Sequence, residues 1–276
     1  MFPRTPQIDP AEDYFTPPDR RRSLRAICLP DSVAFYWYVM STVIRSRLSV
    51  AFGTYDGDMW ARSSRFFQIV LEDMGCRIEV VGLRHVAALD TPCVIAGNHM
   101  SSLETFFLPG LLQPLRDTTF VLKPSLLRMP LFGPVVTTRK PIVVTRDNPR
   151  RDLQIVLEEG TKRLQGGQSV IVFPQSTRGV EFDPRRFNSL AVKLARRAGA
   201  PLVPLALSSR AWGLGRVIKD FGPFDRNAPV RFHFAEPIEV KGSGSEAQER
   251  LVEHIRGHLE SWDVPVRGDE PAGAEA

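Results

Sequence analysis

Residues 94–110 read VIAGNHMSSLETFFLPG, and this stretch places a strand, a short polar turn and a helix in immediate succession. The apolar run that opens the stretch predicts a buried strand, and the apolar spacing that closes it predicts a helix over about 103–112. A serine of the turn can cap that helix, with Glu104 in its first turn. The stretch therefore places His99 at the carboxyl end of a strand, with a carboxylate about one turn further on.

The same alternation continues along most of the chain. From about residue 77, short β-branched runs alternate with amphipathic stretches. This pattern predicts a layered α/β/α domain with a largely parallel central sheet, in which sites usually lie where strands open into loops. The expected strands span 78–83, 93–96, 118–122, 142–145, 169–173, 202–207 and 230–234, and the expected helices span about 103–112, 151–165, 187–198 and 245–260.

Two helices are expected before this domain. The first stretch, 32–44, is apolar and uncharged but shorter than the roughly 20 residues that cross a membrane. The second, about 58–74, carries aromatic and apolar residues at helical spacing, with arginines alongside. Aromatic faces flanked by arginines are typical of an interfacial anchor. The alternative is an ordinary helical hairpin packed on the core.

The bulk composition restricts the possible partners. The chain has 36 Lys plus Arg against 31 Asp plus Glu, and its sequence pI is about 9.4. A modest basic excess suits an anionic membrane, a phosphorylated substrate or an acidic carrier protein. The basic residues are scattered through apolar segments, so we expect no nucleic-acid partner. Cys28, Cys76 and Cys93 are far apart and odd in number, which indicates a reducing compartment without disulfides or a metal site. The start of the chain shows no signal-peptide pattern.

His99 and Glu104 have the residue types of a catalytic pair. A carboxylate that accepts one ring N–H fixes the imidazole tautomer and leaves the other nitrogen as a general base. The carboxylate also stabilises the imidazolium that forms after proton transfer. The alternative is a turn histidine beside an acid that favours the helix dipole. The pair alone does not decide between these interpretations.

Two further segments carry polar residues in an apolar frame. QSVIVFPQSTRGV, residues 168–180, predicts a strand followed by a polar turn that presents Arg178. An arginine there suits bidentate binding of a phosphate, although an ordinary surface turn has the same pattern. Residues 123–150 hold several basic side chains, among them Lys123 and Arg146, which form either an anion pocket or solvated surface. The segment AGAPLVPLAL, residues 198–207, predicts scaffold.

These four segments, in this order, resemble the glycerolipid acyltransferase family that includes the 1-acylglycerol-3-phosphate acyltransferases. The family has Asp where Glu104 stands, and Glu-Gly where Gln175 and Ser176 stand. The resemblance covers about residues 77–235. The matching residues are Asn98, His99 and Glu104 in the first block, Lys123, Pro130, Gly133 and Arg146 in the second, Phe173 to Arg178 in the third, and Pro201, Val203 and Pro204 in the fourth.

The resemblance implies that His99, oriented by Glu104, deprotonates a lipid hydroxyl that attacks an acyl thioester of CoA or acyl-carrier protein. The acceptor is a lysophospholipid such as 1-acylglycerol-3-phosphate, and neither a metal nor an organic cofactor is required. Gln175 and Ser176 leave open a different acceptor, such as an amino-acid or sugar lipid. A non-catalytic lipid-binding relative is a further alternative. The substrate-binding residues that the resemblance implies are Asn98, Lys123, Arg146, Gln175, Ser176, Thr177 and Arg178.

The resemblance also favours a membrane-docking interpretation of the first two helices. We therefore expect a peripheral or monotopic protein on the cytoplasmic face of the cell membrane. The expected organisation is an irregular Pro/Arg-rich arm over 1–30, a two-helix membrane-docking element over 31–75, an acyltransferase domain over 76–262 and a frayed tail over 263–276. A serine hydrolase is not expected, because the sequence lacks a Gly-x-Ser-x-Gly elbow.

Overall fold

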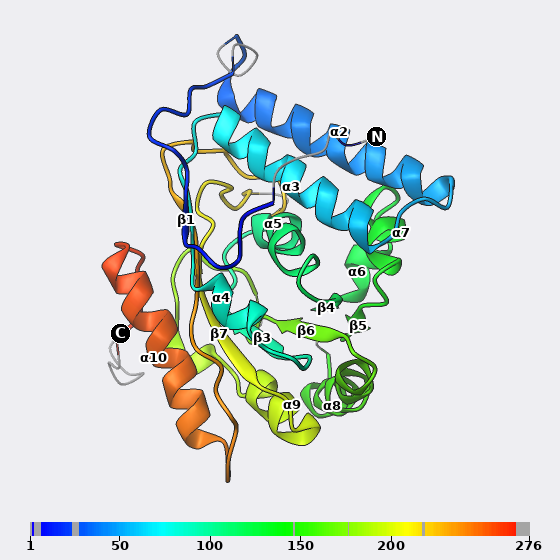
Figure 1. The fold of residues 1–276 in the computed structure, drawn as a ribbon, viewed down its shortest axis with the longest axis vertical. Helices are drawn as coiled ribbons and strands as arrows, with labels where there is room; N and C mark the ends of the chain where they lie inside the picture. Colours follow the sequence, from blue (N-terminus) through cyan, green and yellow to red (C-terminus); the bar gives the residue numbers. More distant parts are fainter. Residues whose placement is uncertain are drawn as a thin grey trace.

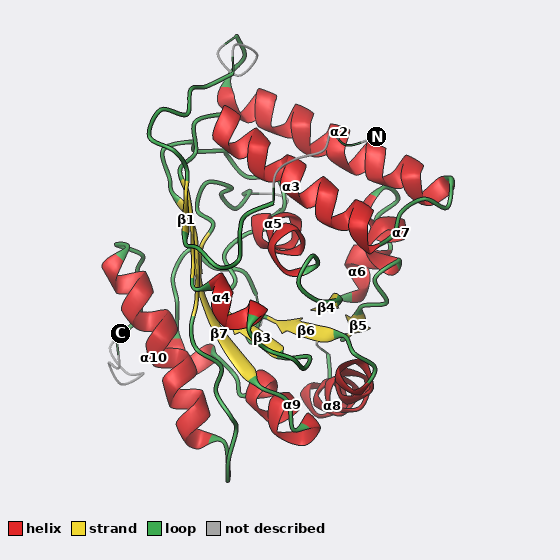
Figure 2. Cartoon of the chain, in the orientation of Figure 1, coloured by secondary structure: helices red, strands yellow, loops and turns green. Residues whose placement is uncertain are grey.

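A central sheet flanked by helices forms the body of the molecule (Figures 1 and 2). The computed structural model describes residues 2, 7–23, 28–145, 147–175, 177–216 and 219–268. In this part of the chain, the sheet has eight strands in the order β1-β2-β8-β7-β3-β6-β4-β5. The strands are β1 Tyr14–Phe15, β2 Ile78–Val81, β3 Val94–Gly97, β4 Thr118–Leu122, β5 Ile142–Val143, β6 Ser169–Val172, β7 Leu202–Ser208 and β8 Val230–Phe234.

The helices cover the sheet and extend beyond one end of it. α2 and α3 lie side by side at one end of the molecule, away from α8, α9 and α10 (Figure 1). A short 3₁₀ helix, η1, spans Pro184–Arg186. The α-helices of the described residues are α2 Asp31–Ala51, α3 Gly57–Asp73, α4 Leu83–Ala87, α5 Leu103–Leu112, α6 Pro124–Leu127, α7 Phe132–Thr137, α8 Pro149–Gln165, α9 Leu190–Ala198 and α10 Ser245–Ser261.

The predicted α/β fold with a largely parallel sheet is confirmed. β7, β3, β6, β4 and β5 are parallel, with Ile95 of β3 opposite Ile171 of β6 and Val203 of β7. β8 runs antiparallel to β7, while β2 is parallel to β8. Every residue of β3, β6 and β7 is buried, as expected for strands covered on both faces. The carboxyl ends of β3, β6 and β4 therefore meet at one edge of the sheet.

α2 continues well beyond the apolar stretch 32–44 that marked it in the sequence and ends at Ala51. The arginines that follow this stretch lie within the helix. Arg45, for example, lies over the ring of Phe66 at 5.7 Å. None of the helices in the described ranges is long and apolar enough to span a membrane.

α3 packs closely on α5, the helix that follows His99. A Cβ at Gly110 of α5 would lie 3.1 Å from the Arg65 amide nitrogen and 3.2 Å from the Ser64 Cβ. The Ser64 hydroxyl donates to the backbone carbonyl of Phe106. The small residues therefore let two helices approach closely, and they join the N-terminal helical pair to the element that carries Glu104.

The two ends of the chain both contact the domain. Within the predicted arm, β1 pairs with β2, and the Tyr14 hydroxyl donates to Oε1 of Glu72 at 2.5 Å. In the predicted tail, the Phe182 amide donates to the Pro265 carbonyl at 2.9 Å, and Val264 is buried. The start of that tail is therefore packed rather than frayed, while residues 269–276 lie outside the described residues.

Candidate active site

The turn after β3 is fixed to β7 by Asn98. Its Nδ2 donates to the Leu207 carbonyl at 2.9 Å, and its Oδ1 accepts from the Leu207 amide at 2.9 Å. A Cβ at Gly97 would lie 2.8 Å from the Leu205 carbonyl oxygen, so only glycine fits this approach of the two strands. Asn98 was expected to bind substrate. Instead, its amide is buried, continues the pairing of the sheet and does not line the cavity beside His99.

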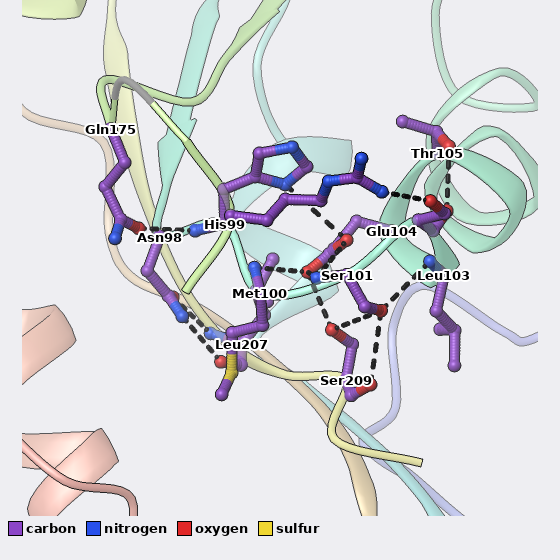
Figure 3. Close-up of polar contacts among 12 residues, drawn as sticks. Asn98, His99, Met100, Ser101, Leu103, Glu104, Thr105, Gln175, Leu207 and Ser209 are labelled. Carbon is purple, nitrogen blue, oxygen red and sulfur yellow. Dashed lines mark hydrogen bonds and ion pairs between the residues drawn. The ribbon is translucent and has the colours of Figure 1, made fainter. Parts of the chain in front are cut away.

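Glu104 is completely buried beneath this turn (Figure 3). Its Oε1 accepts from the Met100 amide at 2.8 Å, from the Ser101 amide at 2.9 Å and from the Ser209 hydroxyl at 2.7 Å. Burial raises the pKa of the Glu104 carboxyl. The combined opposite effect of His99, Ser209 and Ser101 is larger, so the net pKa lies below its usual value. Glu104 is therefore an ionised carboxylate in the protein interior.

His99 lies between this carboxylate and an aromatic ring. Its Nδ1 is 3.6 Å from Oε2 of Glu104, a charge contact slightly longer than a hydrogen bond. The imidazole stacks on Phe173 with 4.5 Å between ring centroids and 7° between planes. Nδ1 is buried and has no hydrogen-bond partner among the described residues, and His99 lines the cavity. The expected pair is thus brought together, with Nδ1 towards Glu104.

Gln175 holds the backbone of the same turn. Its Oε1 accepts from the His99 amide at 2.6 Å (Figure 3). An amide N–H needs only an oxygen acceptor, and a glutamine supplies one as well as a glutamate does. The Gln175 side chain therefore contacts the turn that carries His99, whereas a substrate contact was expected for it, and it does not line the cavity. Ser176, the other departure from the family pattern, lies outside the described residues.

Four basic side chains of the described residues line the cavity: Lys123, Arg139, Arg178 and Lys219. Arg139 lies over the Trp60 ring at 5.5 Å and pairs with Asp117. The other three are here called the basic cluster. Nη1 of Arg178 donates to the Ser102 hydroxyl and to Oδ1 of Asp220, the latter at 2.6 Å. Thr177 also lines the cavity, and its Oγ1 is 3.4 Å from Nζ of Lys219. The structure thus brings Lys123, Thr177 and Arg178 to one cavity, as expected, while Arg146 lies outside the described residues.

The cavity has a volume of about 660 Å³ and runs from His99 and the basic cluster between the sheet and the N-terminal helices. Its walls come from α2, α3, β4, α6 and α7 and are mainly apolar. A row of aromatic rings follows the sheet side: Phe173 lies 6.3 Å from Phe120, which lies 6.0 Å from Trp60. Val39 and Val43 of α2 form part of the opposite wall. The cavity therefore combines the basic cluster beside His99 with mainly apolar walls, in which Arg139 beside Trp60 is a further cation.

The sequence did not identify several residues of this site. Ser209 bonds Glu104, and Ser102 and Asp220 bond Arg178. Ser209 directly follows the buried strand β7, so its position at the sheet edge was a usable signal. Asp220 lies in an irregular segment without any recognisable pattern. Among the described residues, no group of three or more histidine, cysteine or acidic side chains could hold a metal ion.

A histidine against a buried carboxylate, facing a mainly apolar cavity with a few convergent polar groups, is the arrangement expected of an active site. The sequence model of the acyltransferase family matches residues 77–208. The chain is 33% identical over 186 residues to a 1-acyl-sn-glycerol-3-phosphate acyltransferase of Pseudomonas aeruginosa, which covers 67% of this chain and 70% of that protein. This chain belongs to the acyltransferase family and is an enzyme of the 1-acyl-sn-glycerol-3-phosphate acyltransferase type.

Two more distant similarities concern the sequence and the fold. A chloroplastic 1-acyl-sn-glycerol-3-phosphate acyltransferase of Brassica napus is 28% identical over 142 residues, which is 51% of this chain and 39% of that protein. The crystal structure of the 1-acyl-sn-glycerophosphate (LPA) acyltransferase PlsC from Thermotoga maritima has the same fold, with a TM-score of 0.63. That similarity covers 87% of this chain and 96% of the other, at 17% sequence identity.

Proposed function

We propose that this enzyme transfers a fatty acyl group from an acyl thioester of CoA or acyl-carrier protein to the free hydroxyl of a lysophospholipid such as 1-acylglycerol-3-phosphate. His99 is the general base. The observation that carries the proposal is the position of its ring, which lines the cavity with Nδ1 3.6 Å from Oε2 of the buried Glu104 carboxylate. No metal or organic cofactor has a role in this proposal.

In the proposed reaction, Nε2 of His99 takes the proton of the acceptor hydroxyl as its oxygen attacks the thioester carbonyl carbon. The C–O bond forms, the C–S bond breaks, and the departing thiolate receives the proton from the imidazolium. The ionised Glu104 stabilises the imidazolium between these steps. A thioester is already activated, so positioning and charge stabilisation supply most of the remaining catalysis.

The two ends of the cavity fit the two parts of the substrates. The basic cluster binds the acceptor phosphate, because arginine and lysine donate charge-assisted hydrogen bonds to phosphate oxygens. Arg146 is proposed as a further phosphate ligand from the resemblance alone. The apolar channel between the sheet and α2 takes a hydrocarbon chain. Asn98 and Gln175 act indirectly in this scheme, by fixing the turn that carries His99.

The N-terminal helices are proposed to rest on the membrane. Val33, Trp37, Ile44 and Leu48 are spaced along one face of α2 and are exposed, and Phe52 beyond its end is 78% exposed. An exposed apolar face of this kind is unfavourable in water and favourable in the lipid interface. The location that follows is peripheral or monotopic, on the cytoplasmic face of the cell membrane.

The direct test measures thiol release from an acyl thioester with lysophosphatidate as acceptor. His99→Ala is expected to lower kcat by about 10²- to 10⁴-fold, the usual contribution of a general base. His85→Gln, a histidine of α4 outside the cavity, is the matched control and is expected to retain activity. Equal activity of the two variants would exclude His99 as the base, and an absence of turnover in the wild type would favour a lipid-binding protein.

A panel of acceptors tests the second half of the proposal. Lysophosphatidate, a phosphate-free monoacylglycerol, and lyso-lipids with amino-acid or sugar head groups are compared at equal concentration. Because the basic cluster provides positive charge, the phosphate-bearing acceptor is expected to have the highest kcat/KM. A higher value for an amino-acid or sugar lipid would overturn the acceptor assignment while leaving the acyl-transfer chemistry intact.

A further inference from the structure

Arg178, the proposed phosphate-binding residue, is already paired with an anion. Its Nη1 donates to Oδ1 of Asp220 at 2.6 Å, and the Ser102 hydroxyl donates to the same oxygen at 2.8 Å. The side chain of Arg178 is 10% exposed and that of Asp220 is 30% exposed. A carboxylate of the chain itself therefore occupies the anion-binding side of Arg178 in the free enzyme.

The surroundings of Asp220 suit an anion of higher charge than one carboxylate. Ser102 is the N-cap of the ten-residue helix α5, whose N-terminal end carries partial positive charge. Lys123 and Lys219 line the same cavity as Asp220. Burial raises the pKa of the Asp220 carboxyl. The combined opposite effect of Arg178, Ser102 and Lys123 is larger, so the net pKa is below its usual value. Arg178 thus pairs directly with the Asp220 carboxylate, and two lysines line the same cavity.

We propose that Asp220 is an internal competitor for the acceptor phosphate, holding Arg178 in the free enzyme and releasing it when the phosphate binds. This inference rests on the proposed function, in which Arg178 binds that phosphate. A carboxylate and a phosphate repel each other in a cavity of low dielectric, so both cannot pair with Nη1 of Arg178 at once. While the cavity is empty, Asp220 avoids the cost of a largely buried, unpaired guanidinium.

Such competition acts on binding and not on the chemical step. The apparent affinity for a ligand falls by the fraction of the enzyme that is competent to bind it, which here is the fraction with Asp220 displaced. The product keeps the phosphate of the acceptor, so the returning carboxylate also favours product dissociation. Asp220 is therefore a residue that sets the KM for the acceptor.

The test replaces Asp220 by asparagine, which keeps the shape and a hydrogen-bond acceptor but removes the charge. Asp220→Asn is expected to lower the KM for lysophosphatidate by about two- to fivefold, the scale of a partly exposed ion pair, with little change in kcat. Inhibition by inorganic phosphate is expected to strengthen by a similar factor. With a phosphate-free monoacylglycerol as acceptor, the variant and the wild type are expected to behave alike.

Asp73→Asn is the matched control, because Asp73 forms an exposed ion pair with Arg20 and does not line the cavity. It is expected to leave the KM unchanged. A rise in KM for Asp220→Asn would show that Asp220 positions Arg178 for the phosphate, and an unchanged KM would show that the pair plays no part in binding. Either result overturns the proposal.

A binding measurement separates this inference from the proposed acyl transfer. Inorganic phosphate is titrated into the wild type and Asp220→Asn while the thermal unfolding temperature is followed, since a ligand of the native state raises that temperature. Tighter phosphate binding by the variant supports competition even if the acyl donor or acceptor has been misassigned. Equal or weaker binding by the variant overturns it, whatever the enzyme turns over.

Discussion

Glu104 makes more contacts in the site than the one with His99. Besides facing the imidazole, it accepts from two backbone amides of the turn and from the Ser209 hydroxyl. A buried carboxylate with this many donors stays ionised, because each donor favours the charged form. One residue therefore shapes the turn and supplies the negative charge that an imidazolium requires.

This arrangement predicts how stability depends on pH. The pKa of Glu104 is lowered in the folded state, so its contribution is complete above the ordinary value of 4.5 and is lost as the pH falls through the folded-state pKa. Glu104→Gln removes the titrating group. The wild type is therefore expected to lose more free energy of unfolding than the variant below about pH 4.5.

Urea denaturation of both proteins at a series of pH values measures this difference. The variant is expected to be less stable at neutral pH, because two amide donors and a hydroxyl would face an uncharged partner. Parallel pH curves for the two proteins would contradict the lowered pKa. Thiol release at neutral pH is expected to fall in the same variant if Glu104 stabilises the imidazolium.

At the scale of single residues, the sequence predicted the pair His99 and Glu104 because both lie in one short strand–turn–helix segment. It could not predict the parts played by Asn98 and Gln175, whose side chains bond Leu207 and the His99 amide. Those bonds join residues from different strands, and their formation depends on the strand order of the sheet. The resemblance implied a substrate contact for both residues, and the fold gives each of them a bond that holds the turn.

Among the elements, α10 and β8 bring three histidines together. The ring of His258 lies 4.6 Å from those of His233 and His254 and stacks on Trp262 at 5.3 Å. Burial lowers the pKa of His258 to about 4, assisted by the charges of His254 and His233, while Glu79 acts in the opposite direction. Protonation of His258 is therefore disfavoured in the folded state.

His258→Phe tests this cluster because a phenyl ring retains the aromatic packing. Since the folded-state pKa lies below the ordinary value of 6.5, the unfolded chain binds more protons between that value and about 4. Stability from this group is complete above pH 6.5 and decreases as the pH falls. The wild type is expected to lose more free energy of unfolding than His258→Phe between about pH 7 and pH 5.

Urea denaturation at these two pH values decides the point. His233 and His254 also have lowered pKa values, with burial as the first cause. His258→Phe is therefore still expected to lose some free energy of unfolding as the pH falls, but less than the wild type. An equal loss in the two proteins would mean that His258 titrates as an exposed histidine does.

Elements with strong local signals agreed best with the sequence. β4, β8 and α5 span the expected residues, since their apolar patterns and caps act within a few positions. β1, α6 and α7 were not predicted. β1 has two residues and depends on the edge of β2 for its pairing, and α6 and α7 are single turns at the cavity wall. Short elements of this kind are determined by tertiary contacts.

For the whole molecule, the N-terminal helices combine two tasks. One face of α2 lines the cavity through Val39 and Val43, while another presents exposed apolar side chains. The Tyr36 hydroxyl donates to the Gly222 carbonyl at 2.6 Å and accepts from the Trp212 indole at 3.1 Å. A helix that rests on a membrane would thus also form a wall of the channel that receives a lipid chain.

Membrane docking is tested with vesicles that contain anionic phospholipid. Trp37→Glu and Phe52→Glu each place a charge on the exposed face and are expected to weaken vesicle binding by about tenfold, since charges are costly in the lipid interface. Phe15→Glu is the matched control, because Phe15 is 58% exposed but lies on β1. Sedimentation with vesicles gives the bound fraction. Equal binding by all variants would assign the contact to another surface.

The bonds that fix the turn after β3 also govern how the enzyme loses activity on heating. The amides of His99, Met100 and Ser101 each donate to a side chain rather than to water, through Gln175 and Glu104. Exchange of these amide hydrogens with solvent therefore requires opening of the sheet core rather than fraying of a loop. The turn is therefore expected to open on heating together with the sheet core, and a mutation that stabilises a core strand is expected to lengthen the lifetime of the turn.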